Sequence, residues 1–144
     1  MNNDTALLSD LLVAAHRLTR IAAQALGSTT PSAVWHTLAI LSTDGPLRIG
    51  ELATIARVSQ PSMTKVVQQL ITDNLAERIV DPEDSRASLV STLPAGLAAL
   101  AAWRQALASA LQPMFTGLTT DDRATLTRAV DILGSRTASG TVTA

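Results

Sequence analysis

Six polar side chains fall on the outer face of a helix predicted between residues 60 and 73. They are Gln60, Ser62, Thr64, Lys65, Gln68 and Gln69. Side chains of these types can hydrogen-bond to phosphates and to the edges of nucleic-acid bases, and none of the six is acidic. The pattern therefore favours a surface that contacts nucleic acid. The alternative is an ordinary solvated face, which any surface helix has.

A helix-turn-helix explains how this polar face is positioned. Ser59 is a good N-cap for the helix that carries it, and Pro61 falls in the first turn, where its missing N–H does no harm. Apolar residues recur at spacings that bury one face of this helix and of the one before it. They are Leu52, Ala53, Ala56, Val58, Met63, Val66, Val67 and Leu70. We therefore predict helices over residues 49–56 and 60–73, joined by a tight turn at Arg57.

Arg57 stands at a turn position where many helix-turn-helix sequences have glycine. A left-handed backbone at a residue with a Cβ atom costs about 1 kcal/mol. Either the turn is wider than usual, or Arg57 accepts the strain and points at a phosphate.

After the second helix, the pattern of apolar residues changes from a helical period to short strand-like runs. Two strands are predicted over residues 75–80 and 88–93, joined by the polar, turn-rich tip 81–87. Asn74 is suited to a left-handed C-cap in place of glycine. A β-hairpin directly after a helix-turn-helix is a wing.

Helical periodicity also flanks this winged module. The predicted helices are residues 7–26 stopped by Gly27, residues 33–41 capped by Ser32 or Thr30, residues 94–112 ended by Pro113, and a last helix that is capped by Thr119 or Thr120 and carries Leu126, Ala129, Val130 and Leu133. Residues 135–144 are small and polar, and we predict that they are disordered. The fold class is mainly α with a small β-hairpin wing.

Composition limits the classes of protein that fit. The 144 residues suffice for one domain, 47% are apolar and only 2% are aromatic, which favours packed helices over a β-sandwich. The absence of cysteine excludes disulfides and thiolate metal sites. No apolar run is long enough to span a bilayer, so we expect a cytoplasmic protein with no membrane partner. The net charge of −1 gives no global indication of nucleic-acid binding.

The terminal helices contain more leucine and alanine than a winged module of about 60 residues needs. Intertwined ends of two chains would bury this apolar surface, so we predict a homodimer. We expect one domain over residues 1–144. Its winged helix-turn-helix lobe covers about residues 33–93, and its dimerisation helices cover about residues 5–27 and 94–136.

Two signatures at this spacing resemble the MarR family of winged-helix transcription regulators. The first runs from Leu52-Ala53 through Val58-Ser59-Gln60-Pro61-Ser62-Met63-Thr64-Lys65 to Leu70, Leu75 and Glu77-Arg78, and the second is Asp81-Pro82-Glu83-Asp84-Ser85-Arg86-Ala87 with Leu93. The resemblance implies a homodimer whose recognition helices enter the major groove of a pseudo-palindromic double-stranded DNA site. It also implies that Arg86 reaches the minor groove and that Asp84 holds the wing tip.

These arguments together predict twelve residues that contact DNA or shape the contact surface. They are Arg57, Ser59, Gln60, Pro61, Ser62, Thr64, Lys65, Gln68, Gln69, Arg78, Asp84 and Arg86. Phosphate neutralisation would come from the basic members, and base reading from Gln60, Ser62 and their neighbours. The alternative for Arg86 is a tip residue paired with Glu83 or Asp84.

A ligand pocket is a further hypothesis. The resemblance implies that small anionic or phenolic effectors bind at the junction between the terminal helices and the winged lobe. The residues of this sequence that could line such a pocket are His16, Arg20, Trp35, His36 and Trp103. The alternative, which we prefer, is that both tryptophans belong to the core and both histidines lie at partly exposed helix positions.

The chain has no catalytic motif, metal-ligand set or cofactor motif, so we expect no enzyme, no metal and no cofactor. The prediction is a DNA-binding transcription regulator, most simply a ligand-responsive homodimeric repressor. The rival is a winged-helix module that binds a protein and not DNA, favoured by the net charge and by the acidic residues of the wing.

Overall fold

The computed structural model describes residues 2–138, which form six α-helices, one 3-10 helix and one two-stranded sheet. This is the mainly α fold with a β-hairpin that the sequence predicts. One compact unit ends at Ala110 and a second begins at Leu111, and each is described by itself. Among residues 2–138, no helix is long and apolar enough to cross a membrane.

The first helix, α1 (Asn3–Leu26), starts four residues earlier than predicted because Asn2 caps it. The Asn2 side chain accepts a hydrogen bond from the backbone N–H of Asp4 at 3.0 Å. Gly27 ends the helix at φ 62°, as predicted. Ala22 is the only buried residue of α1, and most of its apolar side chains are exposed in the single chain.

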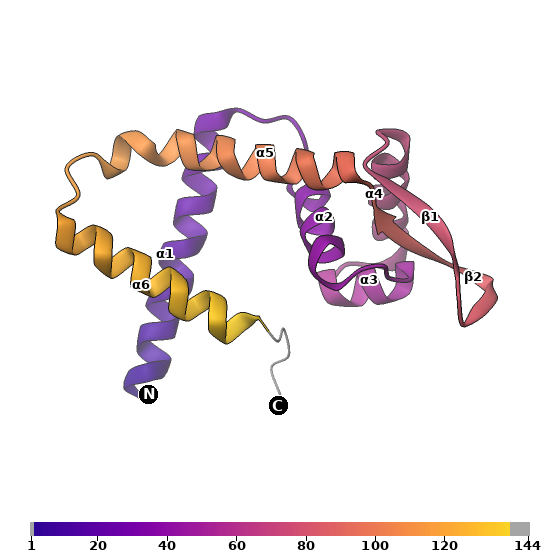
Figure 1. Ribbon diagram of the computed structural model, residues 1–144, viewed down its shortest axis with the longest axis horizontal. Helices are drawn as coiled ribbons and strands as arrows, with labels where there is room; N and C mark the ends of the chain where they lie inside the picture. The colour runs from indigo at the N-terminus through magenta and orange to yellow at the C-terminus, as the bar shows by residue number, and fades with distance from the viewer. Residues whose placement is uncertain (1, 139–144) are drawn as a thin grey trace. The chain divides into compact units, whose positions relative to one another are not determined.

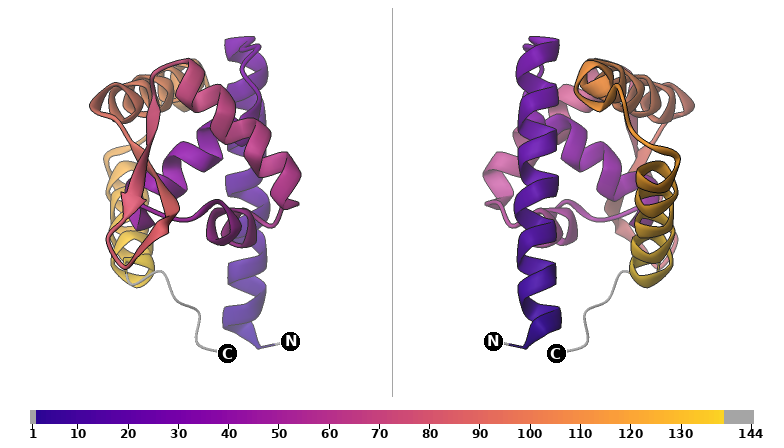
Figure 2. Two further views of the ribbon diagram at one scale, coloured as in Figure 1. Left: turned by 90° about the vertical axis from the view of Figure 1, so that its right-hand side faces the viewer. Right: turned by 90° about the vertical axis from the view of Figure 1, so that its left-hand side faces the viewer.

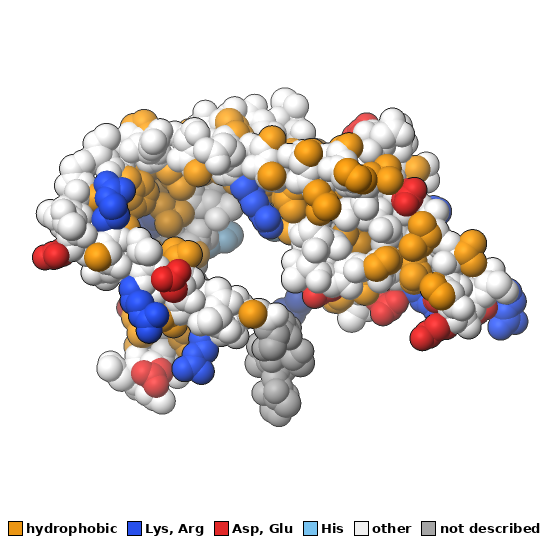
Figure 3. Space-filling view, in the orientation of Figure 1, with side chains coloured by type: hydrophobic (Ala, Val, Ile, Leu, Met, Phe, Trp, Pro, Cys, Tyr) orange, Lys and Arg blue, Asp and Glu red, His pale blue; other side chains and the backbone are white. Residues whose placement is uncertain are grey.

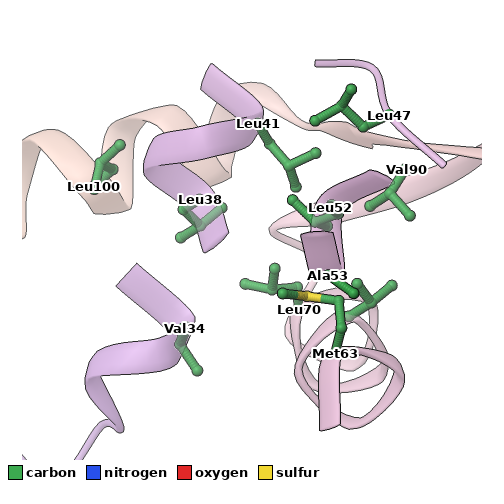
Figure 4. Close-up of a cluster of buried hydrophobic side chains, with 12 residues drawn as sticks. Val34, Leu38, Leu41, Leu47, Leu52, Ala53, Met63, Leu70, Val90 and Leu100 are labelled. Carbon is green, nitrogen blue, oxygen red and sulfur yellow. The ribbon is translucent and has the colours of Figure 1, made fainter. Parts of the chain in front are cut away.

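Three helices and the hairpin of the first unit share one hydrophobic core, to which Leu100 of a later helix also belongs (Figures 1 and 4). The helices are α2 (Ser32–Asp44), α3 (Ile49–Ala56) and α4 (Gln60–Thr72). Leu38 of α2, Leu52 of α3 and Leu70 of α4 are fully buried in it, together with Val90 of the hairpin. Because α4 contributes only one apolar stripe to this core, its polar side is left exposed.

Two details of the predicted helices are wrong. The N-cap of α2 is Pro31, with no side-chain hydrogen bond, so neither Ser32 nor Thr30 caps it. Val58 is 42% exposed, because it lies in the turn after α3, where the helical spacing no longer applies. Asn74 has the predicted left-handed conformation at φ 57°, one residue beyond the C-cap Asp73.

The wing is an antiparallel pair of strands, β1 (Ala76–Asp81) and β2 (Asp84–Thr92). The predicted seven-residue tip is wrong: the strands extend into it and leave Pro82 and Glu83 as the turn. The register shifts between Val80 and Asp81, so that Val80 lies opposite Ser88 and Asp81 opposite Asp84. This irregularity allows strands to continue through a polar segment that reads as a loop from sequence alone.

The next helix, α5 (Pro94–Leu111), begins where α4 and the wing meet. Leu93 donates its backbone N–H to the carbonyl oxygen of Leu75 at 3.0 Å. Gly96 is buried against the same carbonyl, and a Cβ atom added at Gly96 would lie 2.1 Å from it. Glycine therefore permits the close approach of α5 to the segment that leaves α4.

The second unit contains a 3-10 helix, η1 (Gln112–Phe115), and α6 (Thr120–Thr137). Pro113 lies in η1, directly after the end of α5, as predicted. Thr119 and Asp122 form a reciprocal capping box at the start of α6. Because α6 continues to Thr137, disorder from residue 135 is wrong for residues 135–137, and residues 139–144 lie outside the described part of the chain.

Candidate nucleic-acid interface

The start of α4 is held by hydrogen bonds of its own cap. Ser59 accepts the backbone N–H of Ser62 at 3.2 Å, and its hydroxyl donates to the Ser62 hydroxyl at 2.8 Å. Pro61 occupies the first turn, as predicted. The N-terminus of α4 thus has a fixed geometry, and its positive dipole end favours a phosphate.

Arg57 has a left-handed backbone, with φ 58° and ψ 42°. Its N–H donates to the carbonyl oxygens of Ala53 and Thr54, and the N–H of Val58 donates to Ala53 at 3.1 Å. This is the tight helix ending that glycine usually makes, so the turn is not widened. The Arg57 side chain is exposed beside the start of α4.

The polar residues of α4 are all exposed, but hydrogen bonds divide them into two groups. Thr64 donates its hydroxyl to the backbone oxygen of Gln60 at 2.9 Å, and the Gln69 amide donates to Asp73 at 2.9 Å. Within residues 2–138, the side chains of Gln60, Lys65 and Gln68 form no hydrogen bond or ion pair. These three are therefore the most available to a ligand.

At the wing tip, Arg86 and Asp84 form an ion pair. Asp84 Oδ1 accepts the Arg86 backbone N–H at 3.0 Å and its Nε at 3.3 Å. The Arg86 side chain is nevertheless 91% exposed, whereas that of Asp84 is 34% exposed. Figure 3 shows basic and acidic side chains next to one another at this end of the hairpin. An exposed pair of this kind is weak, so Arg86 can exchange Asp84 for a phosphate or a base edge at little cost.

Arg78 is exposed on β1, opposite Val90 of β2. In the left view of Figure 2, α4 and the hairpin both lie toward the viewer. The first unit therefore presents α4 and the hairpin on the same side, and both wing arginines are exposed.

A second ion pair lies where β1 ends and the hairpin turns, and the sequence carried no indication of it. Arg48, the residue before α3, donates Nε and Nη2 to Asp81 Oδ2 at 3.0 and 2.7 Å. The backbone N–H of Glu83 donates to Asp81 Oδ1 at 2.9 Å. These two contacts, that from Glu83 first, lower the pKa of Asp81, and the contact with Asp81 raises the pKa of Arg48. No local spacing joins residues 48 and 81, so the sequence carried no signal for this pair.

The five candidate pocket residues do not line one cavity in the described chain. Trp35 and Trp103 stack on each other, with ring centroids 5.0 Å apart and planes at 8°, and the buried Trp35 indole nitrogen has no hydrogen-bond partner within residues 2–138. His16 and Arg20 line an open groove along α1. His36 instead borders a hollow of about 160 Å³ behind α4, together with Ser62 and Met63.

Comparisons with known proteins place this arrangement in a family. The model of the MarR family matches residues 31–88, from the start of α2 into β2. An uncharacterized HTH-type transcriptional regulator of Mycobacterium leprae is 31% identical over 134 residues, which are 92% of this chain and 94% of that protein. The HTH-type transcriptional repressor IacR of Pseudomonas putida is 28% identical over 99 residues, 69% of this chain and 59% of that protein.

A solved structure agrees on the fold. The crystal structure of a transcriptional regulator from Thermotoga maritima superposes with a TM-score of 0.72 at 19% identity, covering 94% of this chain and 96% of that one. The interaction module that binds protein and not DNA is the weaker reading, because these relatives are named as transcriptional regulators. The chain belongs to the MarR family, and it is a DNA-binding transcriptional regulator with a winged helix-turn-helix.

Proposed function

We propose that this protein is a homodimeric repressor, acting in the cytoplasm, that reads a pseudo-palindromic duplex. The observation that carries the proposal is the face of α4, where Gln60, Lys65 and Gln68 are exposed and their side chains have no partner among the described residues. A helix in the major groove can use glutamine amides on adenine and lysine on guanine or phosphate. The similarity to a named repressor supports the direction of regulation.

Two other elements contribute under this proposal. Arg57 and Arg78 neutralise phosphates on either side of the recognition helix, and Arg86 enters the adjacent minor groove, where a narrow A·T-rich segment attracts arginine. Ser59, Ser62 and Pro61 shape the helix start, and Thr64 and Gln69 flank the contacting side chains. Asp84 orients Arg86 through the 3.0 and 3.3 Å contacts.

The dimer is proposed from the apolar side chains that the single chain leaves exposed on its terminal helices. On α1 these include Leu7, Leu8, Leu12 and Val13, and on α6 they include Leu126, Val130, Ile132 and Leu133. No residue of α6 is buried. Exposed apolar stripes of this length favour association with another surface, and a second copy supplies matching ones. Residues 5–27 and 94–136 therefore supply the dimerisation helices, and residues 33–93 the DNA-binding lobe.

Selection of bound sites from random duplexes tests the proposal. We expect an inverted repeat whose half-sites lie about 10 base pairs apart, because two-fold symmetry places two recognition helices one helical turn apart. Single half-sites or no enriched sequence would contradict the dimeric reading. Lys65→Ala should weaken binding to the selected site about tenfold, within the range for a base or phosphate contact, whereas Thr72→Ala at the far end of α4 should leave it unchanged.

We also propose that a small anionic or phenolic compound relieves repression. The hollow beside His36 supports this proposal, since it is on the scale of one aromatic ring and lies directly behind α4. A ligand there acts only if it prefers one arrangement of the lobe over another. Benzoate or phenol should weaken binding to the selected duplex, and His36→Ala should remove that effect. Equal affinity with and without both compounds would contradict the hollow as an effector site.

A further inference from the structure

The residues just before α3 contact both strands of the wing. Leu47 donates its backbone N–H to Val90 at 3.1 Å and accepts the Val90 N–H at 2.7 Å. Its neighbour Arg48 reaches the other strand, with Nε and Nη2 on Asp81 Oδ2 at 3.0 and 2.7 Å. The start of α3 is therefore attached to β2 through its backbone and to β1 through a charged side chain.

Asp81 occupies the point where the hairpin turns into its tip. It is 7% exposed, and both of its carboxylate oxygens accept hydrogen bonds, Oδ2 from Arg48 and Oδ1 from the backbone of Glu83. The strand register shifts between Val80 and Asp81, and Asp84 is its cross-strand partner. Asp84 in turn holds Arg86. A short path of contacts thus leads from Arg48 through Asp81 to the side chain at the wing tip.

The same path continues in the other direction into the recognition helix. The backbone N–H of Arg48 donates to Glu51 Oε1 at 3.1 Å, which fixes the first turn of α3. Leu52 and Ala53 of α3 pack in the core with Met63 and Leu70 of α4. Arg48 therefore belongs to the rigid helical part of the module, whereas Asp81 belongs to the wing.

We propose that Arg48 and Asp81 are positioning residues that set the angle of the wing to the recognition helix. In this role they allow Lys65 in the major groove and Arg86 in the minor groove to contact one duplex together. The inference rests on the proposed function, in which Arg86 contacts DNA. Neither Arg48 nor Asp81 needs to touch DNA.

The direction in which DNA affinity changes when the Asp81 carboxylate is removed distinguishes a positioning role from a purely electrostatic one. Removing a carboxylate near a DNA-binding surface lowers repulsion of phosphate and by itself strengthens binding. Loss of the wing angle weakens binding instead. The contact of Arg86 with DNA is then either lost or made only at the entropic cost of ordering the hairpin. Asp81→Asn therefore distinguishes the two effects, and Glu77→Gln is the matched control. Glu77 is an exposed acid on the same strand, without a side-chain partner among the described residues.

The experiment measures affinity of the full-length protein for the duplex selected by the wild-type protein, by fluorescence anisotropy. We expect Arg86→Ala to weaken binding about 30-fold in the wild-type background, within the range of a good base contact. Asp81→Asn alone should weaken binding about tenfold, and in that background Arg86→Ala should cost only about threefold, because interacting sites are not additive. Replacing A·T by G·C pairs in the flank should weaken wild-type binding and leave Asp81→Asn binding almost unchanged.

The outcomes separate two failures. If Arg86→Ala has no effect in the wild-type background, the proposed wing contact is wrong and this inference falls with it. If Arg86→Ala is costly by the same factor in both backgrounds, or if Asp81→Asn binds as tightly as Glu77→Gln, the wing contact stands and only the positioning role is wrong. If Asp81→Asn does not fold, Arg48→Lys replaces it, because lysine keeps the charge but cannot make the two-donor contact with Asp81. In the Arg48→Lys background we again expect Arg86→Ala to reduce DNA affinity by a smaller factor than in the wild-type background.

Discussion

Arg57 has two effects that oppose each other. Its left-handed backbone at φ 58° is strained for any residue with a Cβ atom, yet its exposed side chain adds a positive charge beside the start of the recognition helix. A residue that costs stability at a functional surface is expected where the side chain is needed for binding.

We predict that Arg57→Gly raises the free energy of unfolding by about 1 kcal/mol, because glycine adopts this backbone without strain. The same change should weaken DNA binding and lower its salt dependence by about one phosphate contact. Urea denaturation and binding at several salt concentrations measure the two effects. Asn74→Gly is the control, since φ is 57° there too, and it should leave DNA binding unchanged.

The carboxyl of Asp81 makes the stability of the wing depend on pH. Its pKa is lowered by the hydrogen bonds from Glu83 and Arg48, so the folded protein favours the charged form. The stability from this group is present above the pKa of the unfolded chain, about 3.9, and is lost as the pH falls through the lower folded value. Of the other acids near Arg48, Glu51 is exposed and Asp84 is partly buried.

We therefore predict that wild-type protein is more stable than Asp81→Asn at pH 7, and that the difference begins to shrink below about pH 4 and vanishes only below the lowered folded pKa of Asp81. Chemical denaturation of both proteins at pH 7, 5 and 3 measures it. A difference independent of pH would show that Asp81 acts through its shape and not through its charge.

At the scale of elements, the junction of α4, the wing and α5 depends on one glycine. A Cβ atom at Gly96 would lie 2.1 Å from the carbonyl oxygen of Leu75, which is backbone and cannot rotate away. We predict that Gly96→Ala lowers the free energy of unfolding by about 2–3 kcal/mol, the cost of forcing backbone apart in a packed site. Urea denaturation should show no such loss for Gly50→Ala, where the nearest contact is an ordinary 3.6 Å to a side chain.

The elements differ in how far the sequence predicted them. The helix-turn-helix and the capping of α6 follow from contacts within four residues, so they were predictable. The wing strands were placed, but the predicted strands stopped short of the tip, because the register shift at Val80 lets a polar segment pair. The predicted cap of α2 was wrong because the N-cap position is occupied by Pro31, which has no side-chain acceptor, and Ser32 is already the first residue of the helix.

At the scale of the whole molecule, the terminal helices expose apolar side chains in the single chain. We therefore expect a second copy of the chain to stabilise the protein by covering them. Val130 on α6 and Val80 on the wing are both 67% exposed in the single chain. Only the first lies on a helix proposed to dimerise. The pair therefore offers a matched comparison of the same substitution.

We predict that Val130→Glu shifts the protein toward a monomer at micromolar concentration, because a charge is buried in an apolar interface. Val80→Glu should remain dimeric. Sedimentation velocity measures both, and the monomer should also lose affinity for the inverted repeat, since one lobe contacts one half-site. A dimer that is unchanged by Val130→Glu would exclude this part of α6 from the interface.

Features that depend on neighbouring residues follow from the sequence alone. The polar face of α4, its Ser59 cap and the left-handed Asn74 all follow from side chains a few positions apart. By contrast, the packing of the elements establishes which polar side chains of α4 remain available, and it brings together Arg48 and Asp81, which are 33 residues apart in the chain. The reason is physical: a local hydrogen bond is limited by chain geometry, whereas a distant pair depends on how whole elements pack.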